Sequence, residues 1–212
     1  MLIIAHALSE MWCWFAGDAA RALQHAHRAS KLAEAATRGA ASILASAALG
    51  HALLFNKRWS DAAAVLEQAL AAMHERQVGS HLEAFFLADL AHAVAALGDF
   101  GRARVLADEA VSVAQQRRIA EVIPLLARAH VLRLSDGALA AAAIEADLQQ
   151  AMAEVERTDA RAYAPLIHVE RAELAELLGD EAAYQRELRE AHRLFTAMGA
   201  TGHVRRIESV ID

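Results

Sequence analysis

The sequence predicts an all-α protein, a right-handed α-solenoid of about five helical hairpins followed by a short C-terminal helix. About a quarter of the 212 residues are alanine, the residue with the highest helix propensity. No run of alternating β-branched residues, which would indicate a strand, interrupts the chain. Small apolar residues recur with a period of 40 or 41 residues, which is typical of stacked helical repeats.

The clearest hairpin spans residues 90–116. Its first helix is predicted to end at Gly98, because glycine readily adopts the left-handed backbone conformation found at helix ends. Asp99 predicts the N-cap of the second helix, because its carboxylate can accept hydrogen bonds from free backbone amides. The same Gly-Asp pair recurs at residues 17–18 and 179–180, so the turn belongs to a repeat.

Two columns of mostly small residues define that repeat. The first holds Ala22, Ala62, Ala103, Ile144 and Tyr184, and the second holds Ala29, Ala69, Ala110, Ala151 and Ala191. The columns are seven residues apart, or two helical turns, so both lie on one helix face. We expect a single repeat domain over residues 1–212. The expected hairpins cover residues 2–36, 39–77, 81–117, 121–157 and 160–197, and the closing helix covers residues 201–210.

Charge and cysteine content restrict the partners and the compartment. The formal net charge of −6 gives no basic surface for nucleic acid. No stretch approaches the roughly 18 consecutive apolar residues that a membrane span needs. Cys13 is the only cysteine, so no internal disulfide can form, and we expect a cytoplasmic protein. The expected partners are proteins or peptides, without nucleic acid or membrane.

The second hairpin resembles the tetratricopeptide repeat (TPR). The residues that fit the TPR spacing are Leu49, Gly50, Leu53, Ala62, Leu66 and Ala69. The period exceeds the roughly 34 residues of the standard TPR. It resembles the longer repeats of bacterial regulators, namely LuxR-type proteins and proteins that join a class III adenylate or guanylate cyclase domain, an AAA/STAND ATPase and a TPR tail. The segment 194–200, with His203 and residues 206–208, is similar to the end of such tails.

The resemblance implies a non-catalytic scaffold or sensor module that binds a protein or an effector, as the tail of a signal-transduction ATPase or cyclase-type regulator. The phosphate-binding motif G-x-x-x-x-G-K-[ST] is missing from the sequence, and the catalytic residues of those regulators have no counterparts in it. A stand-alone peptide-binding TPR adaptor is the alternative interpretation. An enzyme that uses a histidine-rich groove is a third.

In TPR solenoids the first helices of the hairpins line a concave groove. The column expected to point into it reads Met11, His51, His92, Arg133 and Glu173, and neighbouring positions hold Trp14, Phe15, Phe55, Phe85, His130 and Glu170. This set is apolar and aromatic near the N-terminus and charged near the C-terminus. It suits an elongated ligand with an apolar part and a polar part, and the alternative is that these side chains contact only water.

Eleven histidines raise the question of metal binding and catalysis. The metalloprotease motif H-E-x-x-H is absent, a single cysteine excludes a Cys/His zinc set, and no G-x-S-x-G elbow occurs. We therefore expect no catalytic, metal or cofactor site. A pH-responsive pair of His51 and His92 is a further hypothesis, because imidazole titrates near neutrality.

Two expectations concern packing. Residues 2–16 are apolar on every side, which is typical of a buried helix. We expect this helix to contact upstream repeats, an ATPase module or a second copy of the chain. Trp59 and Phe100 occupy equivalent places at two inter-helix turns, and we expect both to fill the end of their hairpin.

Overall fold

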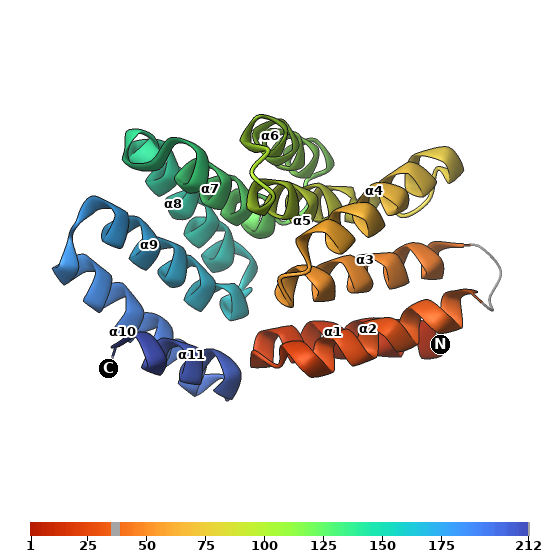
Figure 1. Ribbon diagram of the computed structural model, residues 1–212, viewed down its shortest axis with the longest axis horizontal. Helices are drawn as coiled ribbons and strands as arrows, with labels where there is room; N and C mark the ends of the chain where they lie inside the picture. Colours follow the sequence, from red (N-terminus) through yellow and green to blue (C-terminus); the bar gives the residue numbers. More distant parts are fainter. Residues whose placement is uncertain (35–38, 212) are drawn as a thin grey trace.

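The structure is a computed structural model that describes residues 1–34 and 39–211. Every regular element in this part of the chain is helical (Figure 1). The elements are α1 (Leu2–Ala16), α2 (Ala19–Glu34), α3 (Ala40–Phe55), α4 (Trp59–Arg76), α5 (Glu83–Ala96), α6 (Phe100–Arg117), α7 (Val122–Asp136), α8 (Ala141–Thr158), α9 (Ala164–Leu178), α10 (Glu181–Ala197) and α11 (Thr201–Ile211). They form five hairpins and a terminal helix, which confirms the predicted α-solenoid. The expected end of the first hairpin, residue 36, lies outside the described residues.

The Gly-Asp turns form as the sequence predicts. Gly98 ends its helix with a φ of 89°, a conformation that favours glycine. The Asp99 carboxylate then accepts a hydrogen bond from the backbone amide of Arg102 at 3.1 Å, which caps α6. The Gly-Asp pairs at residues 17–18 and 179–180 repeat both features. The turn therefore sets where one helix stops and the next begins.

Small side chains let the helices of the solenoid pack closely. Nine of the ten residues in the two columns are buried, and most of them are alanine. Gly50 of α3 shows how tight the contact is, since a Cβ added there would lie 2.5 Å from Cδ2 of Leu66 in α4. The exception in the columns is Tyr184, which is only half-buried.

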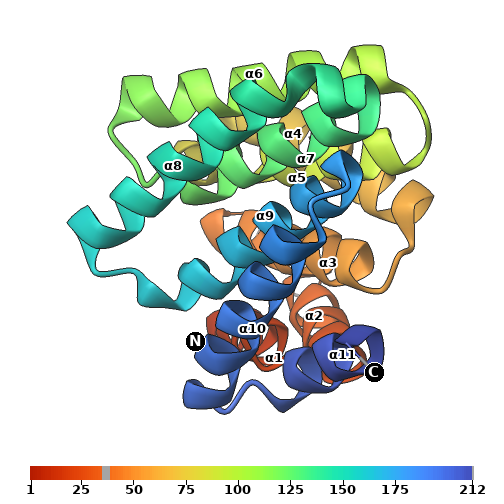
Figure 2. The ribbon, with the colours of Figure 1, turned by 90° about the vertical axis from the view of Figure 1, so that its left-hand side faces the viewer.

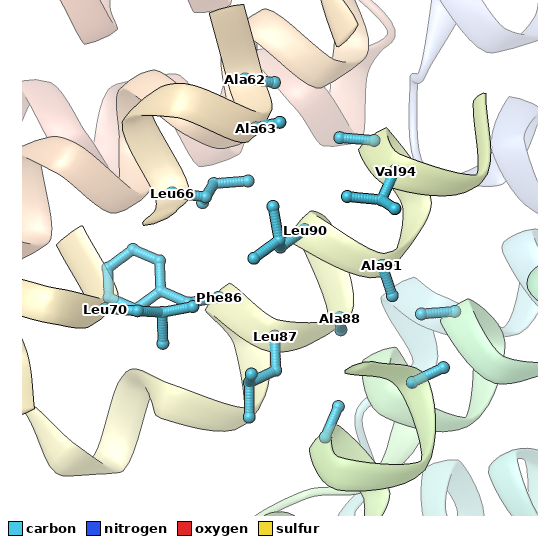
Figure 3. Close-up of a cluster of buried hydrophobic side chains, with 14 of the residues drawn as sticks. Ala62, Ala63, Leu66, Leu70, Phe86, Leu87, Ala88, Leu90, Ala91 and Val94 are labelled. Atoms are coloured by element: carbon cyan, nitrogen blue, oxygen red, sulfur yellow. The ribbon is translucent and has the colours of Figure 1, made fainter. Parts of the chain in front are cut away.

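Larger apolar side chains fill the layer between neighbouring hairpins. In Figure 3, Leu66 and Leu70 of α4 face Phe86 and Leu90 of α5. All four side chains are less than a tenth exposed. This cluster is part of the largest core of the described residues and joins the second hairpin to the third. No described helix is long and apolar enough to cross a membrane.

The hairpins follow one another around a ring, so that the last helix reaches the first (Figure 1). Figure 2 shows α11 beside α1 from a second direction. The backbones of Gly17 and Gly202 meet there, and Nε2 of His203 donates a hydrogen bond to the carbonyl oxygen of Trp14 at 2.9 Å. We call these four residues the clasp. The clasp closes the superhelix, a contact that the repeat pattern did not predict.

Candidate functional site

The closed ring contains a cavity of about 560 Å³. Residues of α3, α5, α7 and α9 supply most of its wall, and residues of α10 and α11 complete it. The wall is mainly apolar. Four lining residues are exposed to solvent and mark the mouth, namely Lys57, Glu176, Arg206 and Val210. The volume lies within the range of roughly 300–1,000 Å³ that is usual for ligand pockets.

Seven of the eleven predicted groove residues line this cavity. They are Trp14, His51, Phe55, His92, His130, Glu170 and Glu173. Six of the seven come from α3, α5, α7 and α9, because the repeat turns the same face of each of these helices to the interior. The placement agrees with the predicted groove, and the binding role of these residues stays a proposal.

The other four predicted residues lie outside the lining, namely Met11, Phe15, Phe85 and Arg133. Met11 is 37% exposed on α1, and Phe15 packs against Tyr163 with ring centroids 5.3 Å apart. Helix α1 lies at the end of the ring beside α11, so only Trp14 in its last turn reaches the cavity. For this reason the groove column cannot be extended unchanged into the first hairpin.

His51 is paired with buried carboxylates. Its Nδ1 donates to Oε1 of Glu10 at 3.0 Å, while the Trp14 ring lies edge-on with centroids 4.8 Å apart. Burial alone lowers the pKa of His51, but the charges of Asp89 and Glu10 outweigh burial and raise the pKa to about 9. Burial also raises the pKa of the Asp89 carboxyl to about 6, against the opposing charge of His51. His51 is therefore an imidazolium at neutral pH.

His92 has the opposite character. Its ring stacks on that of His130 with centroids 3.9 Å apart, and Trp59 lies on it with centroids 6.1 Å apart. Burial, together with the adjacent His130, lowers the pKa of His92 to about 3. The hypothesis of a pH-responsive pair of His51 and His92 near neutrality is therefore wrong. Different neighbours keep the first ring charged and the second ring neutral.

A third polar group joins α7 to α9. Nδ1 of His130 lies 3.2 Å from Oε1 of Glu170, and Arg133 forms ion pairs with Glu170 and Glu173. Burial raises the pKa of Glu170, but contact with His130 and the charge of Arg133 outweigh it and leave the pKa lowered. Burial and the charge of Glu170 raise the pKa of Glu173. The neighbouring cations therefore stabilise the charged form of Glu170 more than that of Glu173.

The ligand atoms of His130, Glu170 and Glu173 lie within 4.8 Å of one another, which is close enough to hold a metal ion. The guanidinium of Arg133 also contacts all three residues. A metal ion at this place would have to displace that guanidinium. We therefore interpret the group as an ion-pair network in the cavity wall.

Some lining residues were missed by the sequence reasoning. Trp59 lies against His92 in the cavity wall, and Phe100 is 39% exposed, so the prediction that both fill a hairpin end is wrong. The two positions are equivalent in sequence, but only the first faces the interior. Asp89 also lines the cavity and was not predicted. Its place three residues before His92, in an otherwise mostly apolar helix, is a sequence signal that indicates an inward-facing polar group.

No protein-family model and no curated protein matches the sequence. Solved structures do match the fold. A putative kinesin light chain with nearly identical TPR-like repeats from Podosopora anserina is 16% identical with a TM-score of 0.57, over 92% of this chain and 95% of that one. A second structure of the same protein is 17% identical with a TM-score of 0.56, over 94% and 95% of the two chains.

A Rap protein complexed with Competence and Sporulation Factor is also similar. It is 12% identical with a TM-score of 0.69, and the match covers 98% of this chain but 64% of the Rap chain. At identities this low, the similarity extends only to the fold. The chain therefore has the fold of a TPR-like repeat protein.

Proposed function

We propose that this chain is a non-catalytic TPR-like module that binds a short peptide or a segment of a partner protein in its central cavity. The cavity of about 560 Å³ carries the proposal, because the inner helices line it with apolar, aromatic and charged side chains together. An apolar wall with a few polar groups is the usual composition of a ligand site. The similar Rap fold, solved with a bound factor, supports the same use of the ring.

The test is a selection of short random peptides on the full chain. The enriched peptides are expected to bind the wild type, and Val169→Phe is expected to weaken their binding at least about tenfold, because Val169 lines the cavity and a larger side chain would fill it. Val105→Phe is the matched control, since Val105 is 65% exposed on α6. Peptides that bind both variants like the wild type, or no enriched peptide at all, would contradict the proposal.

The finer proposal concerns the setting of this module. We infer that it is the tail of a signal-transduction ATPase or cyclase-type regulator, supported by the resemblance of its last repeat and by the surface of α1. Five large apolar side chains of α1 are exposed, namely Leu2, Ile4, Leu8, Met11 and Trp12. Such a patch fits contact with another folded module. An in-frame nucleotide-binding region upstream in the gene would support the regulator, and its absence would favour the stand-alone adaptor.

We expect the isolated chain to self-associate through this surface as its concentration rises, since the patch would otherwise stay in contact with water. Trp12 is 70% exposed, and Trp12→Ser is expected to reduce the association in sedimentation measurements. Val105→Ser serves as the control, because Val105 is exposed on α6 and does not belong to the α1 surface. A wild type that stays monomeric at every concentration would show that α1 does not contact a second copy of the chain.

A further inference from the structure

We propose that the cavity selects a ligand that carries an ammonium or guanidinium group on an apolar body, with the cationic group held at Asp89. This inference rests on the proposed binding function of the cavity and adds the chemical class of the ligand. It follows from three features of the wall, which are its charge balance, one carboxylate without a hydrogen-bond partner, and its aromatic rings.

Acidic groups outnumber basic groups in the interior. The carboxyl groups there belong to Glu10, Asp89, Glu170 and Glu173, and the cations facing them are the His51 imidazolium and the Arg133 guanidinium. Lys57 is exposed at the mouth, and Arg206 lies there with its guanidinium partly desolvated beside the Phe55 ring. Burial is the largest cause of the raised pKa values of Asp89 and Glu173, and the charge of a neighbouring carboxylate raises each further. A bound cation would correct the imbalance.

Asp89 is the carboxylate best placed to receive it. Its side chain lines the cavity from α5, between His51 of α3 and His92 one turn further along α5. Among the described residues, Asp89 has only longer-range charge interactions and no hydrogen bond or ion pair at contact distance. Glu10, in contrast, is bonded to His51, and Glu170 and Glu173 to Arg133. Asp89 is partly exposed to the cavity, so its carboxylate is accessible to a donor from a ligand.

Aromatic rings line the same cavity as Asp89. Five of them line the cavity, namely Trp14, Phe55, Trp59, Tyr184 and Phe195. A cation over an aromatic face is attracted by the ring quadrupole, and more strongly where water is excluded. The wall already shows this contact, since the Arg206 guanidinium lies 5.3 Å from the centroid of the Phe55 ring.

The remaining wall determines the rest of the ligand. Much of the remaining wall offers a ligand no polar group, because it is formed by apolar side chains such as Leu54, Ile123, Leu126 and Leu166. A ligand must therefore combine an apolar body with its positive charge. The amino terminus or a basic side chain of a short peptide meets this requirement, and so does a small hydrophobic amine.

The charge preference can be measured by isothermal titration of the full chain with matched probes. The small-molecule set is phenylethylamine, its neutral analogue phenylethanol and its anionic analogue phenylpropanoate. The peptide set is the amide of the dipeptide Leu-Phe, with a free and with an acetylated amino terminus. In each set the ammonium form is expected to bind at least about tenfold more tightly than its neutral counterpart. A preference in the peptide set alone identifies a peptide source, and a preference in both sets identifies the ammonium group itself.

The variant Asp89→Asn separates the role of this carboxylate from that of the cavity as a whole. It keeps the shape of the side chain but removes its charge, so it is expected to abolish the tenfold preference of the ammonium probes over their neutral counterparts. Asp159→Asn is the control, because the Asp159 side chain is 77% exposed and remote from the lining. Unfolding curves show whether each variant is folded.

Equal binding of charged and neutral probes, or no binding of either, would overturn the cation inference, as would an unchanged preference in Asp89→Asn. These results are distinct from failure of the proposed function. Selected peptides that need the open cavity but not their positive charge would leave the binding function in place and remove only the charge preference.

Discussion

The variant Gly202→Ala is expected to lose about 2–3 kcal/mol of unfolding free energy, although alanine is normally the better residue in a helix. A Cβ at Gly202 would lie 2.6 Å from the carbonyl carbon of Gly17 and closer still to its oxygen. These are backbone atoms, so no side-chain rotation can relieve the overlap. Helix α11 must then move away from α1, and the hydrogen bond from His203 to Trp14 is lost.

Denaturant unfolding measures this loss, and hydrogen exchange of the α1 and α11 amides locates it. Gly101→Ala is the matched control, because Gly101 also lies in a helix but a Cβ there meets only Oδ1 of Asp99, at 3.9 Å. We expect the control to be unchanged or more stable by up to about 1 kcal/mol. Similar stability for both variants would show that the clasp contributes nothing to folding.

Alkaline pH is expected to remove a comparable amount of stability through His51. The pKa of this imidazole rises from 6.5 to about 9 on folding, and its side chain is about a fifth exposed. The folded state therefore binds the proton more tightly than the unfolded state does. This contribution is complete below pH 6.5 and is lost as the pH rises to about 9, a change of about 3 kcal/mol.

The measurement is the unfolding free energy across that pH range in the wild type and in His51→Gln. The wild type is expected to lose stability over the interval, and the variant to lose much less. His92 titrates at about 3, below this interval, and Asp89 at about 6, at its lower edge, so the upper part of the interval gives the clearest comparison. His27→Gln, at an exposed position on α2, should keep the wild-type dependence. Parallel curves for wild type and His51→Gln would refute the assignment.

Local sequence patterns were sufficient for the fold. Gly98 and Asp99 set a turn through their own backbone and side-chain chemistry, and alanine columns at a fixed period set how the helices pack. Both features depend only on nearby residues or on the repeat itself. The same reasoning placed His51, His92 and His130 on the inward faces of successive inner helices, where the structure has them.

The properties of the site depended on information that the repeat does not contain. The charge of His51 is set by Glu10 and Asp89, which belong to two other hairpins. Trp59 and Phe100 hold equivalent places in the repeat, yet the first lines a cavity and the second is exposed. The contact of Gly17 with Gly202 results from the accumulated rotation of all five hairpins. None of these can be derived from one hairpin alone.

The clasp also changes how local unfolding in one repeat affects the others. In an open solenoid each repeat contacts only its neighbours, so its unfolding behaves as that of a linear array and the terminal repeats fray first. Here the two ends are neighbours, and the array is cyclic. A change in α11 reaches α1 directly, without passing through the four hairpins between them. Neither end can fray without breaking a contact with the other. The contact between the ends therefore stabilises the terminal helices, as separate capping repeats do in open solenoids.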